Sequence, residues 1–425
     1  MFIMRGRLKN WSIAWTLIAM LSLAGLFADA QRSPARKPAE QESILRNVLP
    51  RPERLLDWSP QEKTIGFRSF EKLVPVRRVR RKSNQFLLPY ASRELHVSYF
   101  VDGQQWNTTT YMEQNDVAGL LILKRGRIVL ERYALGFDDQ SLWTSFSVAK
   151  SITSTLLGAA IAEGSIGNVD DLVVKYLPAL KGTAYDGVSL RHVLNMTSGV
   201  RWNEDYDDPE SDVNRCHRAT DGGLGSPLVT YLAKLPREAQ PGTKWVYKTA
   251  ETDLVGEIVM AATGKSLSEY LSEKVWSSFG MERDAFWMLR EKKELGGCCL
   301  SVSLRDYGRF GQFMLGGGRV GTKDVLPVGW TKLMVAATPE SERGLRTLGG
   351  TGGYGFQWWT QVDGPGTYSA RGIFGQTIHV NPKHELVIVV LSAWPKALDR
   401  ERRESTVKYL AAVTEAIAVP KSTHK

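Results

Sequence analysis

The stretch Leu142-Trp-Thr-Ser-Phe-Ser147-Val-Ala-Lys150-Ser-Ile-Thr-Ser-Thr-Leu-Leu-Gly-Ala-Ala-Ile161 determines how the rest of the sequence is interpreted. Its apolar residues recur at helical spacing and predict a helix with one buried stripe. That stripe consists of Val148, Ile152, Leu156 and Ala160. Ser147 and Lys150 stand three positions apart where the helix begins, so their side chains share one face.

Ser147 and Lys150 form a candidate pair for nucleophilic catalysis. A serine hydroxyl is a poor nucleophile until a neighbouring base takes its proton, and a lysine can be that base when burial lowers its pKa. The same S-x-x-K spacing also occurs at Ser69–Lys72 and Ser422–Lys425, but only the pair at 147–150 opens a long apolar helix. Spacing alone is equally compatible with a helix start and a solvated lysine.

Two predicted β-hairpins lie on either side of this helix. The runs 117–124 and 127–133 flank Arg125-Gly126, and the runs 376–380 and 385–391 flank the turn at 381–384. Between the hairpins, apolar spacing predicts helices around 147–163, 190–196, 253–262, 267–275 and 303–315, and a closing helix follows at 400–418. We therefore predict an α+β fold, with an antiparallel sheet flanked by helices and a large helical insertion.

The N-terminal region differs in composition from the rest of the 425 residues. Residues 1–30 combine basic residues, an apolar stretch and Ala28-Asp29-Ala30, which predicts a signal peptide or a membrane anchor and hence an exported, periplasmic or periplasm-facing protein. Residues 31–48 read as a flexible linker, and 49–111 as a basic extension wrapping a main domain at 112–420. From Gln31 to Lys82 there are fourteen Lys/Arg and six Asp/Glu, so association of this part with a membrane is conceivable, whereas nucleic acid is not expected.

Three cysteines occur, at positions 216, 298 and 299. Since adjacent cysteines rarely pair, a disulfide would join Cys216 to Cys298 or Cys299, and buried free thiols are the alternative. The sequence contains neither His/Cys spacing typical of a metal site nor a Gly-x-Ser-x-Gly elbow. No cofactor is indicated, and the oligomeric state stays open.

Five short stretches occur in a characteristic order. They are Ser145-Phe-Ser-Val-Ala-Lys150, Leu190-Arg-His-Val-Leu-Asn-Met-Thr-Ser-Gly199, Pro241-Gly-Thr-Lys-Trp-Val-Tyr247, Tyr354-Gly-Phe-Gln-Trp-Trp359 and Gly372-Ile-Phe-Gly-Gln376. From about Val117 to Trp394 the chain resembles the serine β-lactamase and penicillin-binding-protein superfamily. Within it, the chain is most similar to the class C-like esterases and the 6-aminohexanoate-dimer hydrolases.

The resemblance implies roles for individual residues. Ser147 would be acylated, Lys150 would be its base, and Tyr247 would match the tyrosine of the family's Tyr-x-Asn motif and shuttle a proton. Here that motif reads Tyr247-Lys248-Thr249, so its amide side chain is missing. The backbone N–H groups of Ser147 and Ile373 would form the oxyanion hole.

The resemblance also implies substrate contacts at Tyr206, Arg371, Gly372 and Gln376. The family's Lys-Thr-Gly motif is absent, and its best match, Ala370-Arg371-Gly372, keeps only the glycine. Arg371 could replace the missing cation. This departure speaks against penicillin recognition.

These observations predict a serine hydrolase that cleaves an ester or linear amide through an acyl-enzyme on Ser147. Its substrate would be a small ester, amide or peptide. A D-Ala-D-Ala peptidase or β-lactamase is the alternative within enzymes. A catalytically silent binding or sensor protein on the same fold is the alternative of another class. The altered second and third motifs allow it, but the intact Ser147 and Lys150 count against it.

Overall fold

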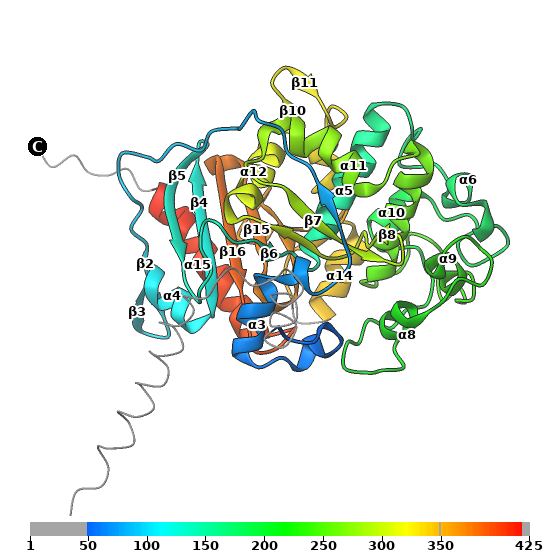
Figure 1. Cartoon of the computed structure of the whole chain (residues 1–425), viewed down its shortest axis with the longest axis horizontal. Coiled ribbons are helices and arrows are strands. Elements are labelled where there is room, and N and C mark those ends of the chain that lie inside the picture. Colours follow the sequence, from blue (N-terminus) through cyan, green and yellow to red (C-terminus); the bar gives the residue numbers. More distant parts are fainter. Residues whose placement is uncertain (1–48, 348–349, 419–425) are drawn as a thin grey trace, which may run out of the picture. The chain divides into compact units, whose positions relative to one another are not determined.

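The computed structural model describes residues 49–347 and 350–418 (Figure 1). The predicted signal peptide or anchor and the linker lie outside the described residues. Within the described ranges, no helix is long and apolar enough to cross a membrane, and no group of His, Cys, Asp and Glu side chains is arranged to hold a metal ion.

The centre of the fold is a seven-stranded antiparallel sheet. In spatial order its strands are β12 (Gly353–Gly355), β13 (Trp358–Thr360), β14 (Tyr368–Arg371), β15 (Thr377–Asn381), β16 (Leu386–Ser392), β4 (Val117–Lys124) and β5 (Arg127–Tyr133). Strand β16 pairs with β4, so the two predicted hairpins join into one sheet although more than 240 residues separate them in the chain. Both hairpins and the α+β class are confirmed.

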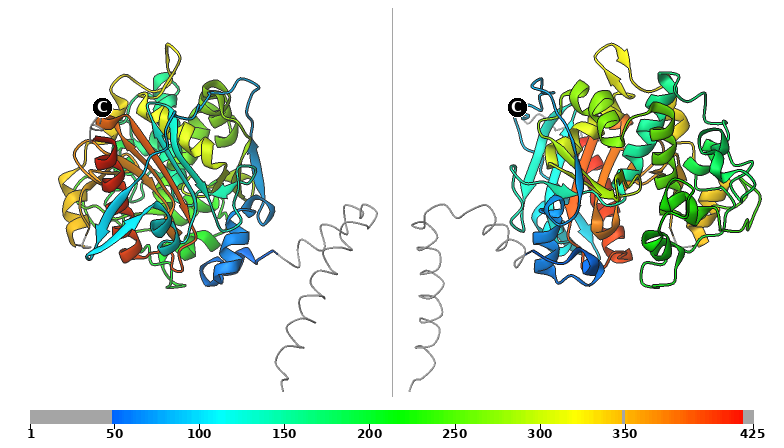
Figure 2. Two further views of the ribbon diagram at one scale, coloured as in Figure 1. Left: turned by 90° about the vertical axis from the view of Figure 1, so that its left-hand side faces the viewer. Right: turned by 45° about the vertical axis from the view of Figure 1, so that its right-hand side comes forward.

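Helices cover both faces of this sheet (Figure 2). On one face, α15 (Arg400–Ala418) and α4 (Thr108–Gln114) pack against Leu120 and Ile122, while α12 (Leu304–Leu315) and α5 (Val148–Ala162) pack on the other. Alternate side chains of a strand point to opposite faces, so a strand buried on both faces is apolar throughout. This explains why the runs 117–123 and 386–391 are almost uninterrupted apolar sequence.

The segment between the two hairpins carries a further set of helices. Its helices are α6 (Val173–Tyr176), α7 (Leu190–Leu194), α8 (Asp212–Arg218), α9 (Pro227–Leu232), α10 (Thr249–Thr263), α11 (Leu267–Leu271), the π-helical η4 (Ser272–Gly280), α13 (Trp330–Met334) and α14 (Pro339–Thr347). Helix α10 packs directly on α5. The helices predicted around 147–163, 190–196, 253–262, 267–275, 303–315 and 400–418 are all present, with ends displaced by a few residues.

A second, smaller sheet connects the insertion to the start of α5. It contains β1 (Val76–Val79), β7 (Ala285–Arg290), β9 (Leu300–Val302) and β6 (Trp143–Thr144), with β8 (Lys293–Glu294) paired to β7. Two short hairpins, β2 (Ser98–Val101) with β3 (Gln104–Asn107) and β10 (Arg319–Val320) with β11 (Lys323–Asp324), lie outside both sheets. Strand β6 ends three residues before Ser147, so this sheet fixes where the helix begins.

The extension at 49–111 contributes to the core through α3 (Pro60–Phe67) and short 3-10 turns at Pro52–Asp57 and Phe70–Lys72. Phe67 lies 5.0 Å from the Phe146 ring and 5.2 Å from the Phe374 ring. The basic run at 77–82 begins in β1, where Arg77 pairs with Glu294 at 2.8 Å. Part of that positive charge is therefore neutralised inside the fold.

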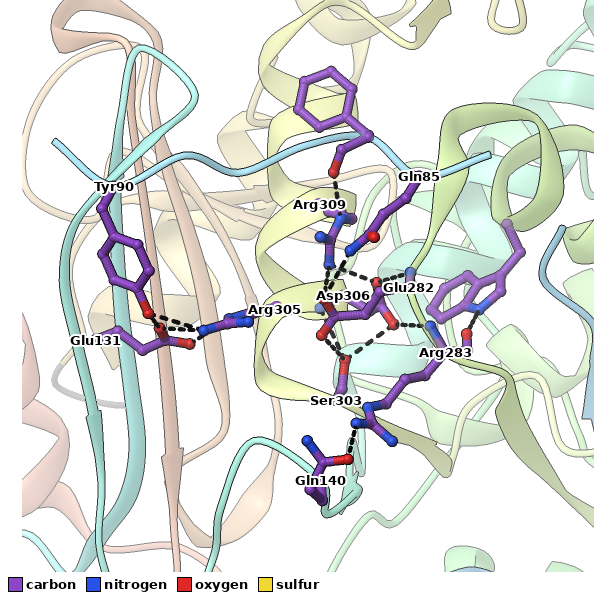
Figure 3. A network of polar contacts seen from close by, with 12 residues as sticks. Gln85, Tyr90, Glu131, Gln140, Glu282, Arg283, Ser303, Arg305, Asp306 and Arg309 are labelled. Carbon is purple, nitrogen blue, oxygen red and sulfur yellow. Dashed lines mark hydrogen bonds and ion pairs between the residues drawn. The ribbon is translucent and has the colours of Figure 1, made fainter. Parts of the chain in front are cut away.

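A buried polar network fastens the extension to α12 (Figure 3). Arg309 donates to the Phe86 carbonyl at 2.8 Å and forms ion pairs with Glu282 and Asp306 at 3.0 and 3.1 Å. Burial raises the pKa of Asp306 to about 6, although Arg309 counteracts the shift. The network links three segments that are distant in sequence.

Replacing Arg309 with alanine should lower the free energy of unfolding by about 3–5 kcal/mol, because two carboxylates then lose their buried cation. Urea unfolding followed by circular dichroism measures the change. Arg319→Ala is the matched control, since Arg319 pairs with Asp324 at 2.9 Å on the exposed β10–β11 hairpin and should contribute about 0–1 kcal/mol. Equal losses in the two variants would contradict this role of the network.

The cysteines pair differently from the prediction. Cys298 and Cys299 are bonded to each other, and Cys216 on α8 is free and buried. The expected disulfide between Cys216 and one of these cysteines is therefore wrong, because the adjacent pair uses both partners. Burial raises the pKa of the Cys216 thiol to about 12, which keeps it protonated.

Candidate active site

Ser147 is the residue immediately before α5 and sits on a fixed turn. Ser145 donates its N–H to the Leu300 carbonyl at 2.7 Å and accepts the Leu300 N–H on its hydroxyl at 2.8 Å. Phe146 adopts a left-handed backbone with φ of 45°, which is costly for a residue with a bulky side chain. This turn leaves Ser147 half-buried while the residues on both sides of it are buried.

Lys150 lies directly behind Ser147 on the same helix face. Its Nζ is 2.8 Å from the Ser147 Oγ and donates to the Gly297 carbonyl at 2.9 Å. The side chain is 1 % exposed. Burial lowers the pKa of Lys150 to about 8, although the negative charges of Glu204 and Asp253 oppose the shift. A sizeable fraction of neutral amine therefore exists near neutral pH, in contact with the hydroxyl that has to lose its proton.

Tyr247 lies beside this pair, in the loop that leads into α10. Its ring centroid is 5.3 Å from the Lys150 Nζ. Burial raises the pKa of the Tyr247 phenol, Glu204 raises it further, and the neighbouring Ser147 hydroxyl lowers it. The loop is held in place by hydrogen bonds from Gly242 and Val246 to the 196–197 turn. The three residues predicted from the resemblance are thus brought together from two separate segments.

The turn at 372–376 approaches Ser147 from the sheet. A Cβ on Gly372 would lie 2.7 Å from the Ser145 carbonyl oxygen, so only glycine allows this approach. In the described part of the chain, neither the Ser147 nor the Ile373 backbone N–H has a protein acceptor. An oxyanion hole requires two such free N–H groups. The close approach of Gly372 to Ser145 and Phe146 brings the turn that carries the Ile373 N–H next to the residues that precede Ser147.

Gln376 does not lie where the prediction placed it. Its side chain is 0 % exposed, accepts from Trp143 Nε1 at 3.0 Å, and donates to the carbonyls of Phe374 and Ser392 at 3.1 and 2.8 Å. Because its side-chain amide is hydrogen-bonded inside the protein, Gln376 stabilises the turn at 372–376 and does not contact a substrate. Gly372 also has a structural role, because its lack of a side chain allows the turn to approach Ser145 closely.

Arg371 is half-buried at the end of β14 and extends over the wall of the site. Its guanidinium lies 5.5 Å from the Trp359 ring centroid, and that ring stacks on Tyr247 at 5.8 Å. Among residues 49–347 and 350–418, the Arg371 guanidinium forms no hydrogen bond and no ion pair within 4.0 Å, although the charge of Asp363 acts on it from further away. Burial, and then the like charge of Arg403, lower the pKa of Arg371. Arg403 on α15 donates to the Gly372 carbonyl at 3.2 Å.

Tyr206 reaches the site indirectly, through Glu204. The Glu204 carboxylate accepts hydrogen bonds from the Trp202 Nε1 at 2.5 Å, the Tyr206 hydroxyl at 2.9 Å and the Thr249 N–H at 2.9 Å, and from the Thr249 hydroxyl. Thr249 stands where the family's Tyr-x-Asn motif has its asparagine. In place of the asparagine amide, this chain has Thr249 hydrogen-bonded to Glu204. The Tyr206 hydroxyl is engaged with Glu204.

Sequence reasoning missed Glu204, Gly297 and Asp253. Their contacts join segments about 45 residues apart or more, and no local spacing signals them. The one sequence clue was the alternation Trp202, Glu204, Tyr206, which places three side chains on the same side of an extended segment.

Comparisons with known proteins agree with this geometry. The family model described as Beta-lactamase matches residues 107–412. The 6-aminohexanoate-dimer hydrolase of Paenarthrobacter ureafaciens is 32 % identical over 294 residues, which cover 67 % of this chain and 74 % of that protein. The residues matched by the family model, 107–412, include all of the segments that form the site.

Two solved structures show the same fold. A Bacillus anthracis protein assigned as a 6-aminohexanoate-dimer hydrolase superposes with a TM-score of 0.73 at 23 % identity, covering 86 % of this chain and 97 % of its own. A family VIII carboxylesterase superposes with a TM-score of 0.56 at 17 % identity, and the match covers 72 % of this chain and 95 % of that chain. By its family match and its relative, the chain belongs to the Beta-lactamase family and is a serine hydrolase.

Proposed function

We propose that the protein hydrolyses a linear amide or ester that carries a carboxylate, through an acyl-enzyme on Ser147. The observation that carries the proposal is the 2.8 Å contact between the Lys150 Nζ and the Ser147 Oγ, with the lysine buried and its pKa lowered to about 8. A second buried lysine, Lys248, contacts the Ser198 hydroxyl at 3.4 Å, but it also pairs with the Glu251 carboxylate at 3.6 Å. Lys150 forms no such ion pair among the described residues, and a buried lysine of lowered pKa beside a serine is typical of an activated nucleophile.

The residues fit the steps of acyl transfer. The Ser147 Oγ attacks the substrate carbonyl carbon while the neutral Lys150 amine takes its proton. The N–H groups of Ser147 and Ile373 stabilise the oxyanion, and the proton passes through Tyr247 to the leaving amine or alcohol. A water molecule then attacks the acyl carbon and gives its proton to the same lysine–tyrosine pair. The pair passes this proton to the departing Ser147 Oγ as the acid leaves, which regenerates the serine hydroxyl and the neutral amine.

The unpaired Arg371 guanidinium supports a substrate that bears a carboxylate, since Arg binds a carboxylate bidentately through a rigid pair of donors. Arg403 adds a second positive charge beside the same turn. The name of the Paenarthrobacter relative, a 6-aminohexanoate-dimer hydrolase, supports a linear amide with a free carboxylate as substrate. We therefore infer that the leaving half of the substrate ends in a carboxylate near Arg371.

Arg371→Ala should raise KM for the 6-aminohexanoate dimer by roughly 10- to 100-fold, because a charge-assisted pair contributes about 1.5–3 kcal/mol. The C-terminal methyl amide of the dimer lacks the carboxylate, so the variant should bring the kcat/KM ratio of the two substrates close to one. Arg371→Lys should recover part of the preference. A wild-type enzyme without preference for the free acid would contradict the assignment.

A fluorescent penicillin tests the alternative enzyme class. Penicillins also carry a carboxylate, so charge alone does not separate the two classes. Stable acylation of Ser147 by the penicillin, together with slow turnover of linear amides and esters, would favour a peptidase over the proposed hydrolase. We expect turnover of p-nitrophenyl butyrate and no stable penicillin adduct.

A further inference from the structure

A single residue, Gly297, connects Lys150 to an acidic residue on the neighbouring helix. The Gly297 carbonyl accepts a hydrogen bond from the Lys150 Nζ at 2.9 Å, and the Gly297 N–H donates a hydrogen bond to the Asp253 Oδ1 at 2.7 Å. Asp253 lies on α10, on the side of Gly297 opposite the lysine. The carboxylate therefore sits behind the base without touching Ser147.

The turn that contains Gly297 is clamped between α5 and α10. A Cβ on Gly297 would lie 2.9 Å from the Thr249 Cγ2, and one on Gly296 would lie 2.5 Å from the Thr252 carbonyl oxygen. From α5, the Thr153 hydroxyl donates to the Gly296 carbonyl at 2.6 Å. In this packing the buried Gly297 N–H needs an acceptor, because an unpaired buried N–H costs about 1–3 kcal/mol. Asp253 supplies it.

A cavity of about 470 Å³ opens beside Asp253. It is bounded by α10, the 221–228 segment and the β7–β8 hairpin. Its lining includes Arg290, whose charge faces Asp253, and the pair Glu257–Lys293 at 2.7 Å. Small ions can therefore reach Asp253 from the side away from Ser147.

Charged groups from several elements surround Asp253, and those that line the cavity beside it are Asp221, Glu257, Arg290, Glu291, Lys292, Lys293 and Glu294. Glu204, from the loop after α7, and Asp253 are the anions that act on Lys150, and Tyr247 is the phenol beside it. Arg290, from β7, acts on Asp253. Burial raises the pKa of Asp253 to about 6, so it is ionised where Lys150 titrates.

We propose that Asp253 is a positioning residue for the base: it fixes the Gly297 carbonyl against the Lys150 Nζ and places a negative charge behind the lysine. The inference rests on the proposed role of Lys150. In the resting enzyme this charge favours the lysine ammonium, and the fixed carbonyl keeps the Nζ aimed at the Ser147 hydroxyl. Together with Glu204, Asp253 thereby sets the lowest pH at which the base works.

The pH profile of kcat/KM for p-nitrophenyl butyrate tests the charge. Asp253→Asn keeps an acceptor for the Gly297 N–H but removes the anion, so Lys150 should lose its proton at lower pH. The acid limb should move down by roughly one pH unit. Glu257→Gln, one helical turn further along the same cavity wall, should keep the wild-type limb. An Asp253→Asn limb that coincides with the wild-type limb would overturn the proposal.

Chemical rescue tests the position. Asp253→Ala removes the acceptor as well as the charge and should lower kcat by roughly 10²-fold, as small misplacements of a catalytic group do. Formate, which fits the cavity and carries the missing carboxylate, should restore at least a tenth of the lost activity, whereas chloride should not. Equal responses to formate and chloride would argue against the proposal.

A third measurement does not depend on turnover. The rate at which a fluorophosphonate labels Ser147 should show the same acid limb and the same downward displacement in Asp253→Asn. If wild-type Ser147 is not labelled, the proposed function fails. If it is labelled but the limb does not move, only the role of Asp253 fails.

Discussion

Ser147→Ala should lower kcat/KM for p-nitrophenyl butyrate by roughly 10⁴- to 10⁶-fold, the loss typical of removing a catalytic serine. The reason is that no acyl-enzyme can form, while the free N–H groups of the oxyanion turn and the substrate contacts remain. Residual activity should therefore exceed the uncatalysed rate without a burst of product. Stopped-flow measurement of p-nitrophenol release gives both the burst and the steady-state rate.

Ser69→Ala is the matched control for this variant. Ser69 and Lys72 repeat the same spacing in the extension, but the Ser69 hydroxyl makes no capping hydrogen bond and no lysine is buried against it. Its loss should leave kcat/KM within about twofold of wild type, as surface substitutions commonly do. Comparable activity of Ser147→Ala and wild type would remove Ser147 from the chemistry.

Lys150→Arg should lower kcat by roughly 10²- to 10⁴-fold, the range expected for loss of a general base. Arginine keeps the positive charge but stays protonated, so it cannot take the Ser147 proton. Lys150→Met should show a similar loss. Both variants should retain most of the substrate affinity, so the effect should fall on kcat and leave KM nearly unchanged.

The wild-type pH profile provides the companion measurement. The base is active in its neutral form, and burial lowers the pKa of Lys150 to about 8, so kcat/KM should rise with pH and level off above roughly pH 8. Lys150→Met should lose this limb. A wild-type profile that is flat between pH 6 and 9 would contradict the lysine as base.

Much of the sheet could be predicted from the sequence because its strands are long and apolar. The runs at 117–123 and 386–391 are buried on both faces, and such runs bounded by turn residues are a strong strand signal. Strand β1 gave no such signal. Its Arg77 and Arg78 become compatible with a sheet only because Glu294 and Asp284 lie opposite them, more than 200 residues later.

The site was predictable where its contacts are local. Ser147 and Lys150 share a helix face by spacing alone, and resemblance added Tyr247 and the turn at Ile373. Glu204 and Asp253 were not predictable, because each contacts a residue about 45 positions away in the chain: Glu204 accepts two hydrogen bonds from Thr249, and Asp253 accepts one from Gly297. Gln376 was placed wrongly because a family position says nothing of the direction in which a side chain points.

Covalent labelling tests the role of Ser147 most directly. The protein is treated with a fluorophosphonate at pH 8.5, its intact mass is measured, and the labelled peptide is sequenced. We expect one adduct per chain, located on Ser147, with labelling abolished in Ser147→Ala and strongly slowed in Lys150→Arg. An adduct on another residue, or equal labelling of wild type and Ser147→Ala, would contradict the assignment of Ser147 as the nucleophile.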